Sequence, residues 1–355
     1  MNSLRIAVLY NLKHHRSVAP DAPADALAEY DSEETVRGFQ SALMARGHQV
    51  VGMEADEGLV ESLLHDRPDF CFNIAEGLRG DARESHVPAL LEVLGIPYTG
   101  SKVLAHAISL DKAIAKRVWR DVGLPTAPFQ VFCREGEPLS RDLCFPLFVK
   151  PVREGSGMGI DGGSLVQDED SLRKRVRWVI QTYRQPALVE QHLAGREFTV
   201  GLIGNAWGAQ DRRSAGLYDE RGFHLFPILE IDAKIGVGEG SYNTAAKSLW
   251  PGEEGAPLYT CPADMPASLE DDLKRLAAEA FEAIGALDVG RVDFRLGPDG
   301  LPHILEINTL PGMKPGLSDL CLMADADGMP YEDLVNEILS LSIDRYSQEG
   351  RSIGC

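Results

Sequence analysis

The residues with the clearest capacity for chemistry lie on two predicted strands near residue 300. Residues 290–294 read GRVDF and residues 304–308 read ILEIN, with a Gly-Pro-Asp-Gly turn between them. Because side chains alternate along a strand, Arg291 and Asp293 share one face, and so do Glu306 and Asn308. Two carboxylates and an amide oxygen suit Mg²⁺ bridging nucleotide phosphates, and Arg291 could stabilise phosphate or oxyanion charge. A solvated hairpin face with a surface ion pair fits the same alternation.

A second candidate is a glycine-rich loop that follows a lysine. Residues 148–159 read FVKPVREGSGMG, so a strand delivers Lys150 and then a loop with unhindered backbone N–H groups. A cation beside such N–H groups makes a phosphate cradle. The Gly157-x-Gly159-x-x-Gly162 spacing matches the dinucleotide fingerprint only weakly, because a strand rather than a helix is predicted to follow it. A tight hairpin that uses glycine for turn geometry remains an alternative.

Further candidates carry weaker signals. The Pro/Gly loop at 308–316 could bring backbone N–H groups to a ligand as an oxyanion hole does, or it could simply reverse the chain. Lys112 on a helix and Lys247 after a glycine-rich segment are surface residues in most proteins. Glu190 and Glu197, near strand ends, could hold a ribose or an adenine.

The elements that must position these residues follow an α/β pattern. Apolar runs and helical spacing predict an N-terminal doubly wound unit with strands 5–10, 49–53 and 69–74 and helices 32–47 and 85–94. Residues 14–30 are rich in Ala, Pro and Asp and predict a mobile loop, and residues 95–102 form a turn-rich boundary. After the boundary we expect helices at 109–122, 171–185, 269–284 and 331–342, and strands at 129–132, 147–151, 164–167, 187–191, 196–203, 288–296 and 301–307.

Composition limits the protein class. The 355 residues are 44% hydrophobic and 25% charged with a net charge of −19, which fits a globular protein of two or three domains. The acidic balance argues against nucleic-acid and anionic-membrane binding, because Lys and Arg make most phosphate contacts. Six scattered cysteines without a CxxC pair predict neither a zinc site nor a disulfide framework. The apolar run at the N-terminus is too short for a signal peptide, and no apolar run is as long as a membrane-spanning helix. We therefore expect a cytoplasmic protein.

Taken together, the motifs resemble the ATP-grasp superfamily and, within it, the D-alanine–D-alanine ligases. The resemblance covers nearly the whole chain in order. The matching stretches are residues 72–73, 91–92, 95–101, 110–112, 149–151, 154–156, 188–190, 195–200, 290–294 and 305–313.

The resemblance implies an ATP-dependent carboxylate–amine ligase that works through an acyl phosphate and releases ADP and phosphate. It implies an N-terminal doubly wound parallel-sheet domain (1–102), a two-lobed α+β ATP-grasp (103–186 and 187–345 with a C-terminal helix) and a tail (346–355). It also implies ATP, two Mg²⁺ ions (or Mn²⁺) and a closing lid near residues 236–250. We further expect small amino-acid-like substrates and a homodimer.

The resemblance assigns a role to each candidate residue. Lys112 and Lys150 would hold ATP phosphates, Glu190 to Leu193 the adenine, Glu197 the ribose and Lys247 the γ-phosphate. The metal ligands would be Asp293, Glu306 and Asn308. Arg291 and the Gly312 N–H would stabilise the tetrahedral centre, and Ser156 would belong to a hydrogen-bonded set beside it.

Departures from the family pattern gather in the substrate pocket. The ligases carry His-Gly where this chain has Glu76-Gly77, and a Tyr where Ser248 follows the lysine. Their Ser-Leu pair falls on Leu317-Ser318. Their N-terminal Glu has no clean counterpart, because Glu29, Glu33 and Glu34 all lie near its position, and of these we assign Glu33. These changes predict a ligase for a different amino acid or a specialised metabolite. D-Alanine–D-alanine ligation with a rebuilt pocket, or a non-catalytic nucleotide-binding module, are the alternatives.

Overall fold

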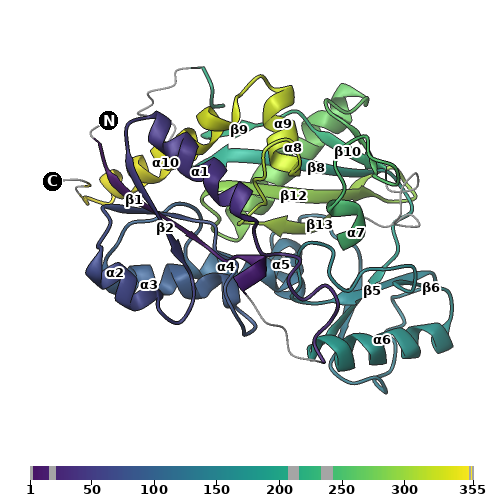
Figure 1. Ribbon diagram of the computed structural model, residues 1–355. Helices are drawn as coiled ribbons and strands as arrows, with labels where there is room; N and C mark the ends of the chain where they lie inside the picture. The colour runs from purple at the N-terminus through teal and green to yellow at the C-terminus, as the bar shows by residue number, and fades with distance from the viewer. Residues whose placement is uncertain (1–2, 16–20, 207–215, 233–242, 352, 354–355) are drawn as a thin grey trace.

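The computed structural model describes residues 3–15, 21–206, 216–232, 243–351 and 353, and it contains three β-sheets in those residues. In Figure 1 the N-terminal sheet lies at the left and a four-stranded sheet at the lower right, while a six-stranded sheet crosses the upper half. We call the parts built on these sheets the N-terminal domain, the first lobe and the second lobe.

The N-terminal domain has a three-stranded parallel sheet in the order β2-β1-β3, which confirms the predicted parallel α/β unit. The central strand β1 is almost entirely buried, as its apolar sequence predicts. Ser32 caps α1 by accepting a hydrogen bond from the Thr35 N–H. The elements are β1 (Arg5–Tyr10), η1 (Lys13–His15), α1 (Glu33–Ala45), β2 (Gln49–Glu54), α2 (Leu59–His65), β3 (Phe70–Asn73), η2 (Arg83–Ser85) and α3 (His86–Leu94).

Two helices, α4 (Val103–Leu110) and α5 (Lys112–Asp121), connect the N-terminal domain to the lobes. The prediction of one helix over 109–122 is wrong at its start. Asp111 has an extended backbone conformation between the two helices, and its side chain accepts a hydrogen bond from the Ile114 N–H at 2.9 Å. The break therefore gives α5 its own cap and places Lys112 in its first turn.

The first lobe is an antiparallel sheet in the order β4-β7-β5-β6, covered by α6. Its elements are β4 (Phe129–Phe132), β5 (Leu147–Pro151), β6 (Leu165–Val166), α6 (Glu169–Tyr183) and β7 (Ala187–Gln191). The predicted lobe boundary before residue 187 is wrong, because β7 pairs with both β4 and β5 and so belongs to this sheet. The chain leaves the first lobe only after Gln191.

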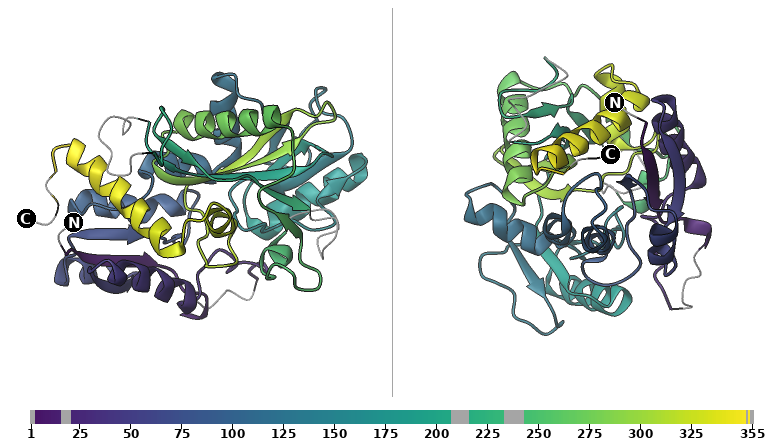
Figure 2. Two further views of the ribbon diagram at one scale, coloured as in Figure 1. Left: turned by 90° about the horizontal axis from the view of Figure 1, so that it is seen from above. Right: turned by 90° about the vertical axis from the view of Figure 1, so that its left-hand side faces the viewer.

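The second lobe has the strand order β11-β10-β8-β12-β13, with β9 paired to β8. Helix α8 covers one face of this sheet, and α9 and α10 lie on the other, as the left view of Figure 2 shows. The elements are β8 (Glu197–Gly204), β9 (Phe223–Leu225), β10 (Leu229–Asp232), α7 (Thr244–Lys247), β11 (Leu258–Thr260), α8 (Ala267–Ala283), β12 (Asp288–Leu296), β13 (Pro302–Asn308), α9 (Asp319–Ala326) and α10 (Tyr331–Gln348).

The C-terminal helix α10 ties the second lobe to the N-terminal domain. It packs along α1, and both views of Figure 2 show it beside the N-terminal segment. Arg345 forms a buried ion pair with Asp288 at 2.8 Å, and Asp288 also accepts hydrogen bonds from Ser342 and from the Gly100 N–H. The helix therefore continues to Gln348, past the predicted end at 342 and past the predicted start of the tail at 346.

Candidate active site

The predicted hairpin of residues 290–308, which we call the acidic hairpin, is present, and its side chains Asp293 and Glu306 face inward. Strands β12 and β13 pair with Asp293 opposite Glu306 and Arg291 opposite Asn308. The side chains of Asp293 and Glu306 are only 14% and 18% exposed, and both line a cavity of about 830 Å³, which we call the first cavity. This burial excludes the alternative of a solvated hairpin face.

Asp293 lies at the centre of a hydrogen-bonded cluster. Arg291 contacts its two carboxylate oxygens through Nε at 2.9 Å and through Nη2 at 3.0 Å, and Thr199 Oγ1 donates to Oδ1 at 2.6 Å. Asn308 Nδ2 lies 3.3 Å from Oδ2. Together with Glu306, this cluster offers carboxylate and amide oxygens on neighbouring strands, and such hard ligands fit a divalent cation.

Glu306 is surrounded by cations. Lys112 Nζ lies 3.5 Å and Lys150 Nζ 4.0 Å from its carboxylate. Burial alone would raise the pKa of Glu306, but the charges of Lys112, Lys150, Lys247 and Arg291 outweigh burial and hold the pKa well below its ordinary value. Glu306 is therefore ionised at neutral pH, and the site concentrates positive charge where a polyphosphate would need it.

A buried lysine that the sequence analysis missed completes this cluster. Lys116 on α5 is fully buried, and its Nζ lies 2.7 Å from Glu190, whose other oxygen lies 2.9 Å from Lys150. Burial alone would raise the pKa of Glu190, but the two lysines lower it. Glu190 thus holds Lys150 in place from the neighbouring strand. The spacing of Lys112 and Lys116 by one helical turn was the only signal in the sequence.

The remaining walls of the first cavity come from both lobes. Glu190 to Leu193 form the end of β7 and the segment directly after it. Phe148, Met158 and Ile160 lie in the first lobe, and Glu197 begins β8. Burial raises the pKa of Glu197, whose carboxylate lies 3.7 Å from Arg295 Nη1. Apolar surface combined with a few directed polar groups is typical of a cofactor pocket.

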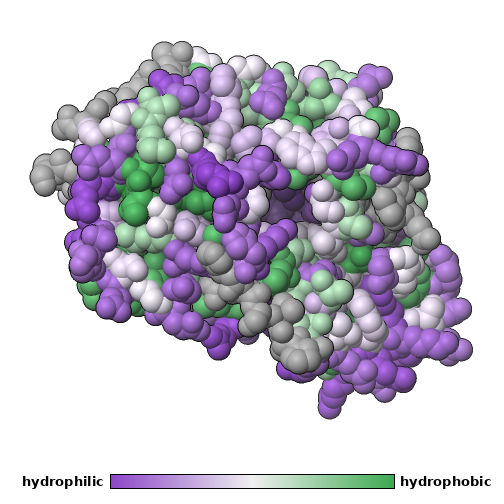
Figure 3. Space-filling view, in the orientation of Figure 1, coloured by the Kyte–Doolittle hydropathy of each residue, from purple (hydrophilic) through white to green (hydrophobic). Residues whose placement is uncertain are grey.

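A second cavity of about 1,130 Å³ adjoins the first, and Lys112, Glu154, Lys247 and Glu306 line both. Figure 3 shows a hollow with a mostly hydrophilic rim near the centre of this face of the molecule. The described residues that line only the second cavity include five of the predicted site residues in addition to Arg291 and Asn308. These are Glu76, Ser156, Gly312, Leu317 and Ser318.

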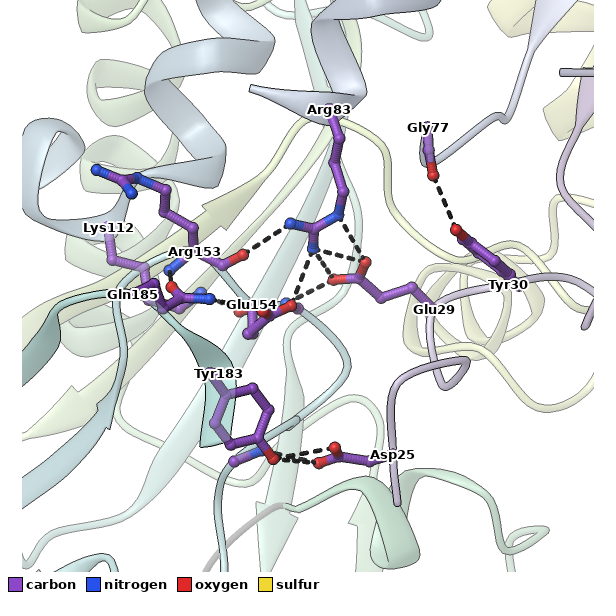
Figure 4. Close-up of polar contacts among 12 residues, drawn as sticks. Asp25, Glu29, Tyr30, Gly77, Arg83, Lys112, Arg153, Glu154, Tyr183 and Gln185 are labelled. Atoms are coloured by element: carbon purple, nitrogen blue, oxygen red, sulfur yellow. Dashed lines mark hydrogen bonds and ion pairs between the residues drawn. The ribbon is translucent and has the colours of Figure 1, made fainter. Parts of the chain in front are cut away.

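The prediction of Glu33 in the substrate pocket is wrong. Glu33 is half exposed on the first turn of α1 and pairs with Arg37 at 3.0 Å. Glu29 lines the second cavity instead, where its Oε1 accepts a hydrogen bond from the Gly155 N–H at 2.6 Å. Figure 4 shows the Arg83 side chain directed toward both Glu29 and Glu154. Arg83 Nη2 lies 2.7 Å from Glu29 and 3.2 Å from Glu154. The loop at 14–30 has no periodicity, so only the tertiary structure distinguishes these carboxylates.

Helix α7 brings Lys247 to the junction of the two cavities. Thr244 Oγ1 donates a hydrogen bond to the Ser156 carbonyl at 2.9 Å, so the start of α7 lies against the glycine-rich loop. Of the segment predicted to close the site, residues 236–242 lie outside the described residues. The described remainder, residues 243–250, contains the contacts just given.

Comparison with known proteins places these features in a family. Residues 118–340 match the family model described as D-ala D-ala ligase C-terminus. The chain is 36% identical over 319 residues to an uncharacterised protein, y4sG, of Sinorhizobium fredii, covering 87% of this chain and 88% of that one. It is 33% identical over 310 residues to the D-alanine–D-alanine ligase of Geotalea uraniireducens, covering 86% and 89%. The chain belongs to the D-alanine–D-alanine ligase family.

Solved structures agree on the fold of this ligase. The D-alanine–D-alanine ligase from Bacillus anthracis, in a crystal structure complexed with ATP, aligns with a TM-score of 0.71 at 24% identity, over 98% of this chain and all of that one. The fold is therefore the predicted ATP-grasp. The family assignment makes the chain an ATP-dependent ligase that forms an amide bond between small molecules and uses a divalent metal ion. None of the described helices combines the length and apolar character that a membrane crossing requires.

Proposed function

We propose that this ligase activates the carboxylate of one amino-acid-like substrate with ATP and joins it to the amine of a second. The γ-phosphoryl group moves to the carboxylate oxygen, and ADP leaves. The amine nitrogen then attacks the acyl carbon, loses a proton and displaces phosphate, which leaves an amide. The observation that carries this proposal is the meeting of two cavities at Lys112, Lys247 and Glu306.

In this proposal the first cavity holds ATP. Lys112, Lys150 and Lys247 neutralise the phosphates, Glu190 to Leu193 receive the adenine and Glu197 receives the ribose. Phosphoryl transfer needs charge neutralisation and alignment more than covalent help from the protein. The three lysines supply the positive charge, and Glu190 holds Lys150 in position. The transferring phosphate would lie toward the residues shared by the two cavities.

The divalent ion belongs on the acidic hairpin. Asp293, Glu306 and Asn308 would hold two Mg²⁺ ions, or Mn²⁺ in their place, because all three offer hard oxygen ligands near one another. The metal would supply charge stabilisation for the phosphates. Arg291 keeps Asp293 oriented toward this position through two hydrogen bonds.

The second cavity holds the joined substrates in this proposal. Arg291 and the Gly312 N–H both lie at this cavity and would stabilise the oxyanion of the tetrahedral centre. Ser156, in the glycine-rich loop, would orient the substrate, and Leu317 and Ser318 would contact its far end. The chemistry needs a site protected from water, because an acyl phosphate hydrolyses readily.

Some relatives are named D-alanine–D-alanine ligases, so D-alanine is the first substrate to test. We propose that it is not the preferred one, because Glu76 places in the substrate cavity a carboxyl group that has no ion-pair partner among the described residues. The test incubates the purified protein with ATP, Mg²⁺ and either D-alanine alone or a panel of amino acids, and follows phosphate release and product mass. Phosphate release with an amide product supports the ligase. No release with any substrate overturns it, and efficient D-alanyl-D-alanine formation overturns the proposed preference.

We also propose a homodimer. Val93 at the end of α3 and Leu104 in α4 are 84% and 70% exposed, and exposed aliphatic side chains on neighbouring helices favour association. Light scattering coupled to size-exclusion chromatography measures the mass directly. A mass of about 77 kDa, twice that of the 38.7 kDa chain, supports the dimer, and 38.7 kDa excludes it.

A further inference from the structure

The wall of the second cavity that the N-terminal domain contributes is acidic. Asp31 precedes α1, Glu76 follows β3 and Glu84 lies in η2, and all three line the cavity. We call these three residues the acidic wall. The cavity is a candidate substrate site on other grounds, namely the glycine-rich loop, Arg291 and the loop at Gly312, so the acidic wall bears on which substrate it accepts.

The other acidic residues of this cavity have cationic partners. Glu29 and Glu154 both pair with Arg83, at 2.7 and 3.2 Å. Asp319 lies 3.4 Å from Arg291. Glu306 lies within 4.0 Å of Lys112 and Lys150. Each of these carboxylates therefore has a cation within ion-pair distance, although Glu29 and Glu154 share one guanidinium.

The acidic wall has no such compensation in the described residues. The side chains of Asp31 and Glu76 make no hydrogen bond or ion pair there, and Lys13 affects Asp31 only from beyond ion-pair distance. Glu84 has His106 Nδ1 at 3.9 Å, but burial lowers the pKa of His106 to about 4, so this histidine is neutral at pH 7. Three carboxyl groups thus line one side of the cavity, and among the described residues no lysine or arginine lies within ion-pair distance of any of them.

The electrostatic cost of this arrangement is visible in the pKa values of the three groups. Burial raises the pKa of Asp31 to about 7, although the charge of Lys13 opposes it. Burial, together with the charges of Glu29, Glu84 and Asp31, raises the pKa of Glu76 well above its ordinary value despite the opposing charge of Arg83. Burial and the charge of Glu29 raise the pKa of Glu84 to about 8, although Arg83 and Lys112 oppose them. A cation in the cavity would reverse these shifts, because an opposite charge favours the ionised form.

The cation that fits is organic. The described residues contain no group of three His, Cys, Asp or Glu side chains placed to hold a metal ion. The cavity, at about 1,130 Å³, is also far larger than an ion requires. An amino acid brings one α-ammonium group, which leaves acidic groups of the wall still uncompensated.

We infer that one of the two joined amino acids carries a second cationic group, an ammonium or a guanidinium on its side chain, which binds to Asp31, Glu76 and Glu84. This inference rests on the proposed ligase function and names the substrate class of the same site. Glu76 is then the specificity-determining residue, since it lies among the other acidic groups and has no partner in the described residues.

The test measures kcat/KM for matched pairs of substrates with ATP and Mg²⁺, using both enantiomers. Lysine and ornithine are compared with norleucine and norvaline, and arginine with citrulline, so that each pair differs mainly in charge. We expect each cationic amino acid to exceed its neutral partner by about 100-fold, the effect of pairing a buried charge. Equal values for the two members of each pair, with ADP and amide formed from both, overturn the inference while the ligase function stands. No turnover with any amino acid overturns the ligase function itself.

The variant Glu76→Gln separates charge from shape. It should lower kcat/KM for the cationic substrate at least 10-fold while leaving that for the neutral partner unchanged or higher. The matched control is Glu57→Gln, a 77% exposed carboxylate that pairs only with Arg79 among the described contacts and should change neither value. An equal loss for cationic and neutral substrates in Glu76→Gln would show a structural role and contradict the inference.

A binding measurement keeps the inference testable if turnover is slow. Removing one of several repelling carboxylates should raise the melting temperature of the ligand-free protein, so Glu76→Gln is expected to fold. Calorimetric titration with lysine in the presence of a non-hydrolysable ATP analogue and Mg²⁺ should give at least 10-fold weaker binding for Glu76→Gln than for the wild type. Unchanged affinity overturns the assignment of Glu76.

Discussion

Replacing Glu190 by glutamine should destabilise the folded protein strongly, because Glu190 neutralises two buried lysines. Lys116 is fully buried, and Glu190 and Lys150 are 3% and 5% exposed. In Glu190→Gln, Lys116 Nζ can still donate hydrogen bonds to Thr126 Oγ1 at 2.6 Å and to the Ile304 carbonyl at 3.2 Å, but it has no carboxylate partner. Removing one partner of a buried ion pair costs about 3–5 kcal/mol. At about 1–2 °C per kcal/mol for a chain of 355 residues, the melting temperature should fall by about 3–10 °C.

The control for this prediction is Lys116→Met, which removes a charge and leaves the Lys150–Glu190 pair intact. Thr126 Oγ1 still donates to the Ile304 carbonyl at 2.9 Å in this variant, so these two groups keep a hydrogen bond. We expect a cost of about 1–2 kcal/mol. Thermal melting by circular dichroism measures both variants at pH 7. A smaller loss for Glu190→Gln than for Lys116→Met would refute the reasoning.

The pH dependence gives a second check. The pKa of Glu190 is lowered in the folded state, so its carboxylate contributes full stability above its unfolded-state pKa. That contribution is lost as the pH falls through the folded-state value, which lies below the ordinary 4.5. The difference in melting temperature between wild type and Glu190→Gln should therefore stay constant from pH 7 to about pH 5 and narrow below about pH 4.5. A difference that widens on acidification would contradict the lowered pKa.

Three further predictions concern the hairpin and the C-terminal helix. Arg291→Ala should lower kcat by about 10²–10³ with a smaller effect on the KM for ATP, as loss of an oxyanion donor does; steady-state kinetics that show the reverse order would contradict it. Glu306→Gln should reduce Mg²⁺-dependent phosphate release by about 100-fold or more, and near-normal release at ordinary Mg²⁺ would remove Glu306 from the metal site. Asp288→Asn should lower the free energy of unfolding by about 3–5 kcal/mol, because Arg345 loses its buried partner. An unchanged melting temperature would contradict a stabilising role of this ion pair.

Local features of the fold could be predicted from the sequence. The apolar run of β1 and the turn between β12 and β13 depend on residues close together in the chain, and the structure confirms both. The acidic hairpin was predictable for the same reason, since a period of two determines which side chains share a face. Whether that face was buried or solvated remained open, because alternation fits both.

Packing between distant segments could not be predicted. The place of β7 in the first lobe depends on its partners β4 and β5, and apolar residues alone do not indicate which sheet a strand joins. The assignment of Glu29 rather than Glu33 depends on a contact with Gly155, which is 126 residues away. Arg345 lies beyond the predicted end of the last helix at residue 342, and only the tertiary structure shows Asp288 beside it.

The sequence by itself determined the type of chemistry: a lysine before a glycine-rich loop, and carboxylates in register on a hairpin, are local arrangements of donors and charges. Only the tertiary structure decided which charges are compensated. Lys116, Glu190 and Lys150 come from three separate elements, and the carboxylates of Asp31, Glu76 and Glu84 meet only when the N-terminal domain closes one side of the second cavity. Charge compensation in a buried site depends on distance and on exclusion of water, and both are properties of the folded chain.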